Sequence, residues 1–196
     1  NWMKAAIYYA LAFTEGQAPI EKYERLCREM IAEFQNREAA MTLERTLKTC
    51  SVIRSRVDTT SISRSTIEKK LEGSEPSLQP WIHFCLALSF LRADDQEKAA
   101  EEAQRAIDSS KRMDDLRLGQ LVSSSSGAVL AMAKYRQGDR QESRSALRAA
   151  EEVFADRIPN RADGNIDVLN NANRSNHHDA LVARMLLNEA RQAMKD

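Results

Sequence analysis

Glycine and proline are scarce in this chain of 196 residues, which contains six of the first and four of the second. A sheet-rich fold needs many turn residues, so this shortage argues against one. Aromatic residues make up only 6%, whereas Ala and Leu are abundant. Together with frequent Glu, Arg, Met and Gln, they favour helix. The composition therefore predicts an all-α fold.

Cysteine is also rare, with single residues at Cys27, Cys50 and Cys85. An odd number at wide spacing, with no C-x-x-C pair, indicates no disulfide framework. Each cysteine lies among apolar residues at helical spacing. Buried free thiols are typical of a reducing compartment, so we predict an intracellular, cytoplasmic protein.

An excess of charge of either sign is missing, because 29 acidic residues balance 29 basic ones. This balance argues against nucleic-acid binding, and the close mixing of signs is typical of solvated helix faces. The exception is 53–70, where Arg54, Arg56, Arg64, Lys69 and Lys70 stand against Asp58 and Glu68. We interpret this segment as a solvated hairpin; phosphate contact, or phosphorylation of its serines and threonines, stays open as an alternative.

Long apolar runs are absent too, and none approaches the roughly 20 residues of a membrane span. The segment 3–16, "MKAAIYYALAFTEG", superficially resembles a secretory signal. Because Tyr8 and Tyr9 interrupt its apolar run, we interpret it as an amphipathic first helix. The chain begins at Asn1 without an initiator methionine, so we expect it to be part of a longer polypeptide.

Apolar residues recur at i, i+3, i+4 and i+7 along most of the chain, which predicts helices. We expect them over 3–14, 20–34, 37–53, 62–72, 81–92, 96–110, 118–136, 140–155 and 178–194. A linker is expected over 73–80 and a loop over 156–176. Consecutive helices would pair as antiparallel hairpins over 3–34, 37–72, 81–110 and 118–155, with a closing helix, in a single domain over 1–196.

Two segments repeat each other: 84–108, "FCLALSFLRADDQEKAAEEAQRAID", and 128–152, "AVLAMAKYRQGDRQESRSALRAAEE". Each has an apolar helix, a short polar turn with Asp, and a helix with small residues every three or four positions. Small residues let two helices approach closely. A hairpin that cannot bury its own face stacks on the next one.

The repeated pattern resembles the tetratricopeptide repeat, which has a Leu, a small residue and an aromatic, then a Gly-Asp turn and spaced alanines. The matching residues are Leu86, Ala87, Phe90, Asp95, Ala99 and Ala106, then Leu130, Ala131, Tyr135, Gly138, Asp139 and Ala150. Corresponding residues lie 44 positions apart, against roughly 34 in the family, and the usual terminal proline is missing. The resemblance implies stacked antiparallel hairpins in an irregular, tetratricopeptide-like array.

The order of segments is similar to tetratricopeptide-like tails that follow the kinase domain in some bacterial serine/threonine kinases. This resemblance covers most of 8–194 and is weakest over 54–80. Its residues are Tyr23, Arg25, Cys27, Phe34, Thr49, Cys50, His178, Asp179, Ala183, Arg184, Leu187, Glu189 and Ala190. The chain has no Gly-rich loop, His-Arg-Asp or Asp-Phe-Gly motif of a kinase. The resemblance therefore implies a signalling module rather than a kinase.

Candidate catalytic residues do not form a convincing site. His177 and His178 are adjacent, so on a helix they point about 100° apart, whereas a shared metal needs i, i+4 spacing. We place Asp179 in the first turn of the last helix, where a carboxylate favours the helix dipole. Ser123–Ser126 have no nearby base and are interpreted as a small-residue surface. His83, in an apolar helix, is interpreted as a core histidine bonded to a neighbour.

We therefore predict a non-catalytic protein–protein interaction scaffold with no catalytic residue, metal or cofactor, no nucleic-acid partner and no membrane insertion. The resemblance implies a groove lined by the first helix of each hairpin. Aromatic and arginine side chains are common anchors at interfaces, so we expect contacts from Tyr8, Trp81, Arg92, Tyr135 and Arg136. The alternative is an intramolecular module that regulates or spaces a catalytic domain of the same polypeptide. A stand-alone enzyme would instead require a buried polar cluster with a deep pocket.

Overall fold

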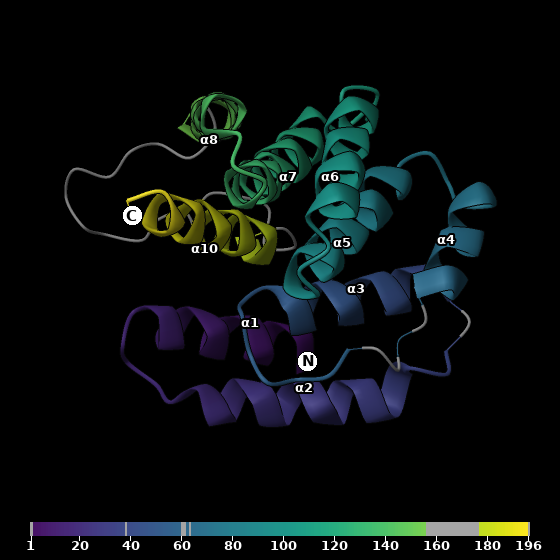
Figure 1. Cartoon of the computed structure of the whole chain (residues 1–196). Helices are drawn as coiled ribbons and strands as arrows, with labels where there is room; N and C mark the ends of the chain where they lie inside the picture. Colours follow the sequence, from purple (N-terminus) through teal and green to yellow (C-terminus); the bar gives the residue numbers. More distant parts are fainter. Residues whose placement is uncertain (1, 38, 60–61, 63, 156–176, 196) are drawn as a thin grey trace.

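The protein is described by a computed structural model over residues 2–37, 39–59, 62, 64–155 and 177–195 (Figure 1). Within these residues the chain forms nine helices and no strand, which confirms the predicted all-α class for the described part. The helices are α1 (Trp2–Thr14), α2 (Ile20–Phe34), α3 (Ala40–Ser51), α4 (Arg64–Glu72), α5 (Gln79–Arg92), α6 (Gln96–Ser110), α7 (Leu116–Arg136), α8 (Arg140–Ala155) and α10 (His177–Ala193).

Most helices begin and end within a few residues of the predicted positions. The predicted start of α5, residue 81, is two residues too late. The helix begins at Gln79, and Pro80 occupies its first turn. A proline there loses no hydrogen bond, since the first N–H groups of a helix are unpaired. α7 begins two residues early because the carboxylate of Asp115 accepts hydrogen bonds from the first backbone N–H groups. The loop predicted over 156–176 lies outside the described residues.

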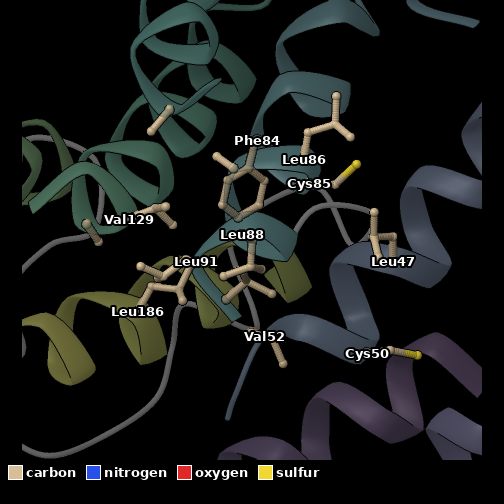
Figure 2. Close-up of a cluster of buried hydrophobic side chains, with 14 of the residues drawn as sticks. Leu47, Cys50, Val52, Phe84, Cys85, Leu86, Leu88, Leu91, Val129 and Leu186 are labelled. Carbon is tan, nitrogen blue, oxygen red and sulfur yellow. The ribbon is translucent and has the colours of Figure 1, made fainter. Parts of the chain in front are cut away.

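Helix α5 lies at the centre of the hydrophobic core. Its apolar residues point in nearly all directions, and it packs against α3, α4, α6 and α7. Figure 2 shows Phe84 and Leu91 of α5 between Leu47 of α3, Val129 of α7 and Leu186 of α10. This helix is therefore buried on most sides.

The hairpins α5–α6 and α7–α8 turn in the same way. Asp94 in the first turn and Gly138 in the second both adopt left-handed backbone angles, with φ of 58° and 87°. The next residue in each turn, Asp95 or Asp139, donates its N–H to the carbonyl five residues earlier at 3.0 Å. Its carboxylate accepts from the N–H three residues later. The repeat seen in the sequence thus extends to the backbone of both turns.

Small residues form the crossing between α7 and α8. A Cβ atom at Gly127 would lie only 2.7 Å from the Cβ of Ala150. The hydroxyl of Ser124 donates to the carbonyl of Ala150 at 3.0 Å, and that of Ser143 donates to the carbonyl of Ala131 at 2.8 Å. The serine run of α7 therefore lets two helices approach closely, as the sequence predicted.

The last helix brings the two ends of the described chain together. α10 packs against α7 and α8 on one side and against α1 on another (Figure 1). α1 in turn packs against α2 and α3. One cluster of buried hydrophobic residues consequently extends from α1 to α10.

Candidate functional site

An open groove lies between α6 and α8, with α7 as its floor. Its volume is about 1020 Å³. The floor carries Ser123, Gly127 and Leu130. The apolar residues of the walls are Ala100 and Ile107 on α6, and Ala146, Ala149, Ala150 and Val153 on α8. We call this surface the α6–α8 groove.

The groove exists because α8 has more apolar residues than its neighbours cover. Of its residues only Ser143 and Ala150 are buried, where α8 crosses α7. Ala146, Ala149 and Val153 lie on the groove side and stay partly or fully exposed. The groove therefore has an accessible apolar wall on α8. A second apolar stripe on α8, beyond the one that contacts α7, is the sequence signal that would have located the groove.

The rim of the groove is acidic. Glu97 and Glu101 of α6 and Glu142 of α8 lie along it, against the single lysine of the lining, Lys134 of α7. Lys134 is already paired, with its Nζ atom 2.6 Å from a carboxylate oxygen of Glu142. Glu101 is also paired, with Arg105 of α6, so the net negative charge of the rim comes from Glu97.

The predicted contact residues lie elsewhere. All five are among the residues that the structure describes, and none of them lines the α6–α8 groove. Tyr8 is 43% exposed on α1. The ring of Trp81 lies 4.3 Å from the Nζ atom of Lys48. Tyr135 is covered by Arg140, whose guanidinium carbon is 3.5 Å from the ring centre. The groove also differs from the one implied by the family resemblance, since it is walled by the second helix of each hairpin.

Arg92 and Arg136 come together at the end of α5, where both hold helices in place. The Arg92 side chain is 11% exposed and donates to the carbonyls of Ser51 and Val52, each at 2.8 Å. It also binds the carboxylate of Glu189 on α10 at 2.7 Å. Arg136 donates to Asp94 at 3.2 Å, within the neighbouring hairpin. Arg92 therefore links α3, α5 and α10, a role that its sequence neighbours do not reveal.

A buried charge cluster joins α3 to α10. Lys48 is 3% exposed, and its Nζ atom lies 2.9 Å from Glu44 and 3.2 Å from Asp179. Burial alone lowers the pKa of Lys48, but the charges of Asp179 and Glu44 outweigh it and raise that pKa above its usual value. Burial also raises the pKa of Glu44, with Lys48 opposing. Besides its predicted position in the first turn of α10, Asp179 thus binds a lysine of a distant helix.

This cluster is suited to holding helices together rather than to catalysis. A lysine kept as its ammonium ion has no free electron pair to act as a base or nucleophile. The α6–α8 groove is not lined by Lys48, Glu44 or Asp179. In the described part of the chain, no group of three or more His, Cys, Asp and Glu residues is placed to hold a metal ion.

Two of the histidines contact carboxylates of the same chain. The Nδ1 atom of His83 lies 2.7 Å from a carboxylate oxygen of Glu102, which confirms a core histidine bonded to a neighbour. The Nε2 atom of His178 lies 3.3 Å from Asp179. The side chain of His177 lies outside the described residues.

Residues that carry the resemblance to kinase-associated tails contact one another in the core. The hydroxyl of Tyr23 donates to the carbonyl of Thr49 at 2.8 Å, and the thiol of Cys50 is 3.7 Å from the carbonyl of Cys27. Burial, followed by the neighbouring thiols, raises the pKa of Tyr23. A hydrogen bond with Cys27 and burial raise the pKa of Cys50, and burial raises that of Cys85. All three cysteines are free and buried, as predicted.

No model of a known protein family matches the chain, and neither a curated protein nor a solved structure is significantly similar to it. Among the helices that the structure describes, none combines the length and the apolar character needed to cross a membrane. The geometry of the α6–α8 groove is therefore the main guide to function.

Proposed function

We propose that this protein is a non-catalytic interaction scaffold, and that the α6–α8 groove binds an amphipathic helix of a partner protein. The observation that carries this proposal is the accessible apolar stripe of Ala146, Ala149 and Val153, which faces α6 across a floor that includes the small residues Ser123 and Gly127. Small side chains let a helix approach to the usual axial distance of about 8–10 Å. Burial of one apolar helix face in a groove is a recurrent mode of peptide recognition.

The acidic rim defines the chemistry of the partner. Glu97 and Glu101 on one wall and Glu142 on the other favour lysine or arginine beside the apolar face of the bound helix. We therefore expect apolar partner residues at i, i+3 or i+4, and i+7, with basic residues on both flanks. The helix belongs either to a separate protein or to another domain of the same polypeptide.

We also infer that the two hairpins are an irregular tetratricopeptide-like pair. Support comes from the matching turns at Asp94 and Gly138 and from the small residues at the helix crossing. The large offset between the repeats has a local source, because α7 has 21 residues and α5 has 14. The resemblance to kinase-associated tails places such a pair beside a signalling domain, and that association remains part of the proposal.

The test is a selection from a displayed library of helical peptides, with the full chain as bait. Selected sequences should share the apolar spacing and the basic flanks described above. We expect Ala149→Arg to weaken their binding by about tenfold or more, because the new side chain fills the groove and repels basic residues. Ala32→Arg is the matched control, since Ala32 is an exposed alanine on α2, far from the groove.

Peptides that bind both variants equally well would show that the groove is not the binding surface. A selection that yields no binder would contradict the proposal outright. A search of the polypeptide's own sequence for a helix with the selected pattern separates the two sources of the helix. If such a helix, joined to the chain, blocks peptide binding in cis, the occupant is intramolecular.

A further inference from the structure

A second cavity lies on the opposite side of α5, among the end of α3, the segment after it, the start of α4 and the end of α5. Its volume is about 340 Å³. Three arginines, Arg54, Arg64 and Arg92, line it, against a single acidic lining residue, Asp58. We propose that this arginine cavity binds a phosphate monoester, independently of the α6–α8 groove.

Arg64 is the principal ligand in this proposal. Its Nε atom donates to the hydroxyl of Ser89 at 2.8 Å, and its Nη2 atom donates to the Ser89 carbonyl at 3.2 Å. Its guanidinium carbon lies 4.9 Å from the ring centre of Phe90. Asp58 is the acidic residue that lines the same cavity, and no ion pair between it and Arg64 is seen in the described part of the chain. The guanidinium is thus half-buried and held in one orientation by Ser89 and Phe90.

A partly buried guanidinium that lacks a close ion pair is stabilised when an anion binds to it. Phosphate suits this position, because a guanidinium presents parallel N–H donors that match two phosphate oxygens. Ser89 and Phe90 fix the plane of the Arg64 fork in advance. A ligand therefore finds a preorganised donor rather than a mobile one.

Arg54 supplies a second, adjustable donor. Its side chain is 67% exposed, and its contact with Asp94 is long, at 3.4 Å. Such an exposed pair contributes little, so Arg54 can turn towards a ligand at small cost. Arg92 adds positive charge, but its guanidinium already binds Glu189 and two carbonyls. Burial lowers the pKa of nearby Arg136, whereas the charge of Asp94 raises it. The charges of Arg54 and Arg92 lower this pKa further, as expected where positive charges are crowded.

Ser51 provides independent support for a ligand. It lines the cavity and is 1% exposed, yet its hydroxyl oxygen has no hydrogen-bond partner among the described residues. A buried hydroxyl without a hydrogen-bond partner is unfavourable, and a phosphate oxygen would accept a hydrogen bond from it. The volume lies at the lower end of the range for ligand sites, roughly 300–1000 Å³. The cavity therefore fits a phosphate with a small attached group rather than a nucleotide.

The experiment titrates the full chain with O-phospho-L-serine, with inorganic phosphate and with unmodified serine, and follows backbone amide shifts by NMR. We expect saturable binding of phosphoserine, none of serine, and shifts centred on Ser51, Ser89 and Ala93. Comparable binding of inorganic phosphate would identify free phosphate as a sufficient ligand. Weaker binding would show that the attached group contributes. Both results support the phosphate site.

Variants separate the cavity from general charge. Arg64→Gln should weaken phosphoserine binding by about tenfold or more, because charge-assisted hydrogen bonds are lost. Arg54→Gln should weaken it less, and it preserves the fold because the residue is exposed. Arg25→Gln on α2, also an exposed arginine, is the matched control and should change nothing.

Three results would overturn the proposal: no saturable binding by the unchanged protein, equal weakening by Arg64→Gln and Arg25→Gln, or amide shifts centred away from the cavity. If Arg64→Gln does not fold, Arg54→Gln decides. Binding unaffected by that change then counts against the site, and weakened binding supports it.

Discussion

Helices α6 and α8 hold equivalent places in two matching hairpins, yet their surroundings differ. α6 buries seven residues because it packs between α5 and α7. α8 buries two, since its neighbours are α7 and α10, and no described residue covers the side that faces α6. The same hairpin pattern therefore produces core on one helix and an accessible apolar surface on the other. The number of neighbours, rather than the composition of the helix, decides which outcome occurs.

The largest effect on stability is expected in the buried charge cluster between α3 and α10, where Lys48 also contacts Trp81 of α5. Lys48→Met should reduce the free energy of unfolding at pH 7 by about 3–5 kcal/mol, because Glu44 and Asp179 stay buried without their cation. Urea unfolding measures this loss. The control Lys69→Met, at an exposed position on α4, should change little.

The same variant has a defined pH dependence. Glu44 already has a pKa raised by burial, and loss of Lys48 raises it further. A carboxyl whose pKa is higher in the folded state than in the unfolded state stabilises the fold as the pH falls through that folded value. The deficit of Lys48→Met should therefore shrink between pH 7 and about pH 4. A deficit that stays constant over this range would mean that the two carboxyls are not left uncompensated.

A pair of identical changes tests the comparison of α6 with α8 directly. Ala103→Leu on α6 should destabilise the protein by about 1–3 kcal/mol, because Ala103 is fully buried and the core has no room. Ala149→Leu on α8 should change stability by about 0.5 kcal/mol or less, since Ala149 is exposed in the groove. Thermal unfolding of both variants is the measurement. Equal losses would show that the groove is closed in solution.

A smaller loss than that of Ala103→Leu is expected in the turns that the two hairpins share. Gly138→Ala should reduce stability by about 1 kcal/mol, because the left-handed backbone there disfavours a Cβ atom. Gly73→Ala is the control, since its Cβ would meet nothing within 4 Å and its backbone is not left-handed. Chemical unfolding of the two variants should resolve the difference. Equal stability would show that the turn relaxes to accept the side chain.

The sequence predicted local features well because they depend on near neighbours. Helix α2 matches its predicted range, since one apolar stripe and the flanking Pro19 define it. The repeated turns were visible in Asp95 and Asp139 for the same reason. Local reasoning also placed Asp179 correctly in a first helical turn, but it could not find the lysine that Asp179 binds.

Contacts between distant residues could not be predicted. Lys48 and Asp179 are 131 positions apart, and Arg92 and Glu189 are 97 apart, with nothing in the sequence to pair them. The prediction that Arg92 binds a partner followed from its residue type, and the structure gives this side chain several partners within the chain. The α6–α8 groove was missed because it depends on which helix lacks a neighbour.

The central claim is that a partner helix binds in the α6–α8 groove, and amide hydrogen exchange tests it most directly. Exchange would be measured for the full chain with and without a selected helical peptide. The account predicts added protection in α8 around 146–153 and in the facing part of α6, with α1 and α2 unchanged. Protection centred instead on Tyr8 of α1, around Trp81 of α5 or around Tyr135 of α7 would contradict it.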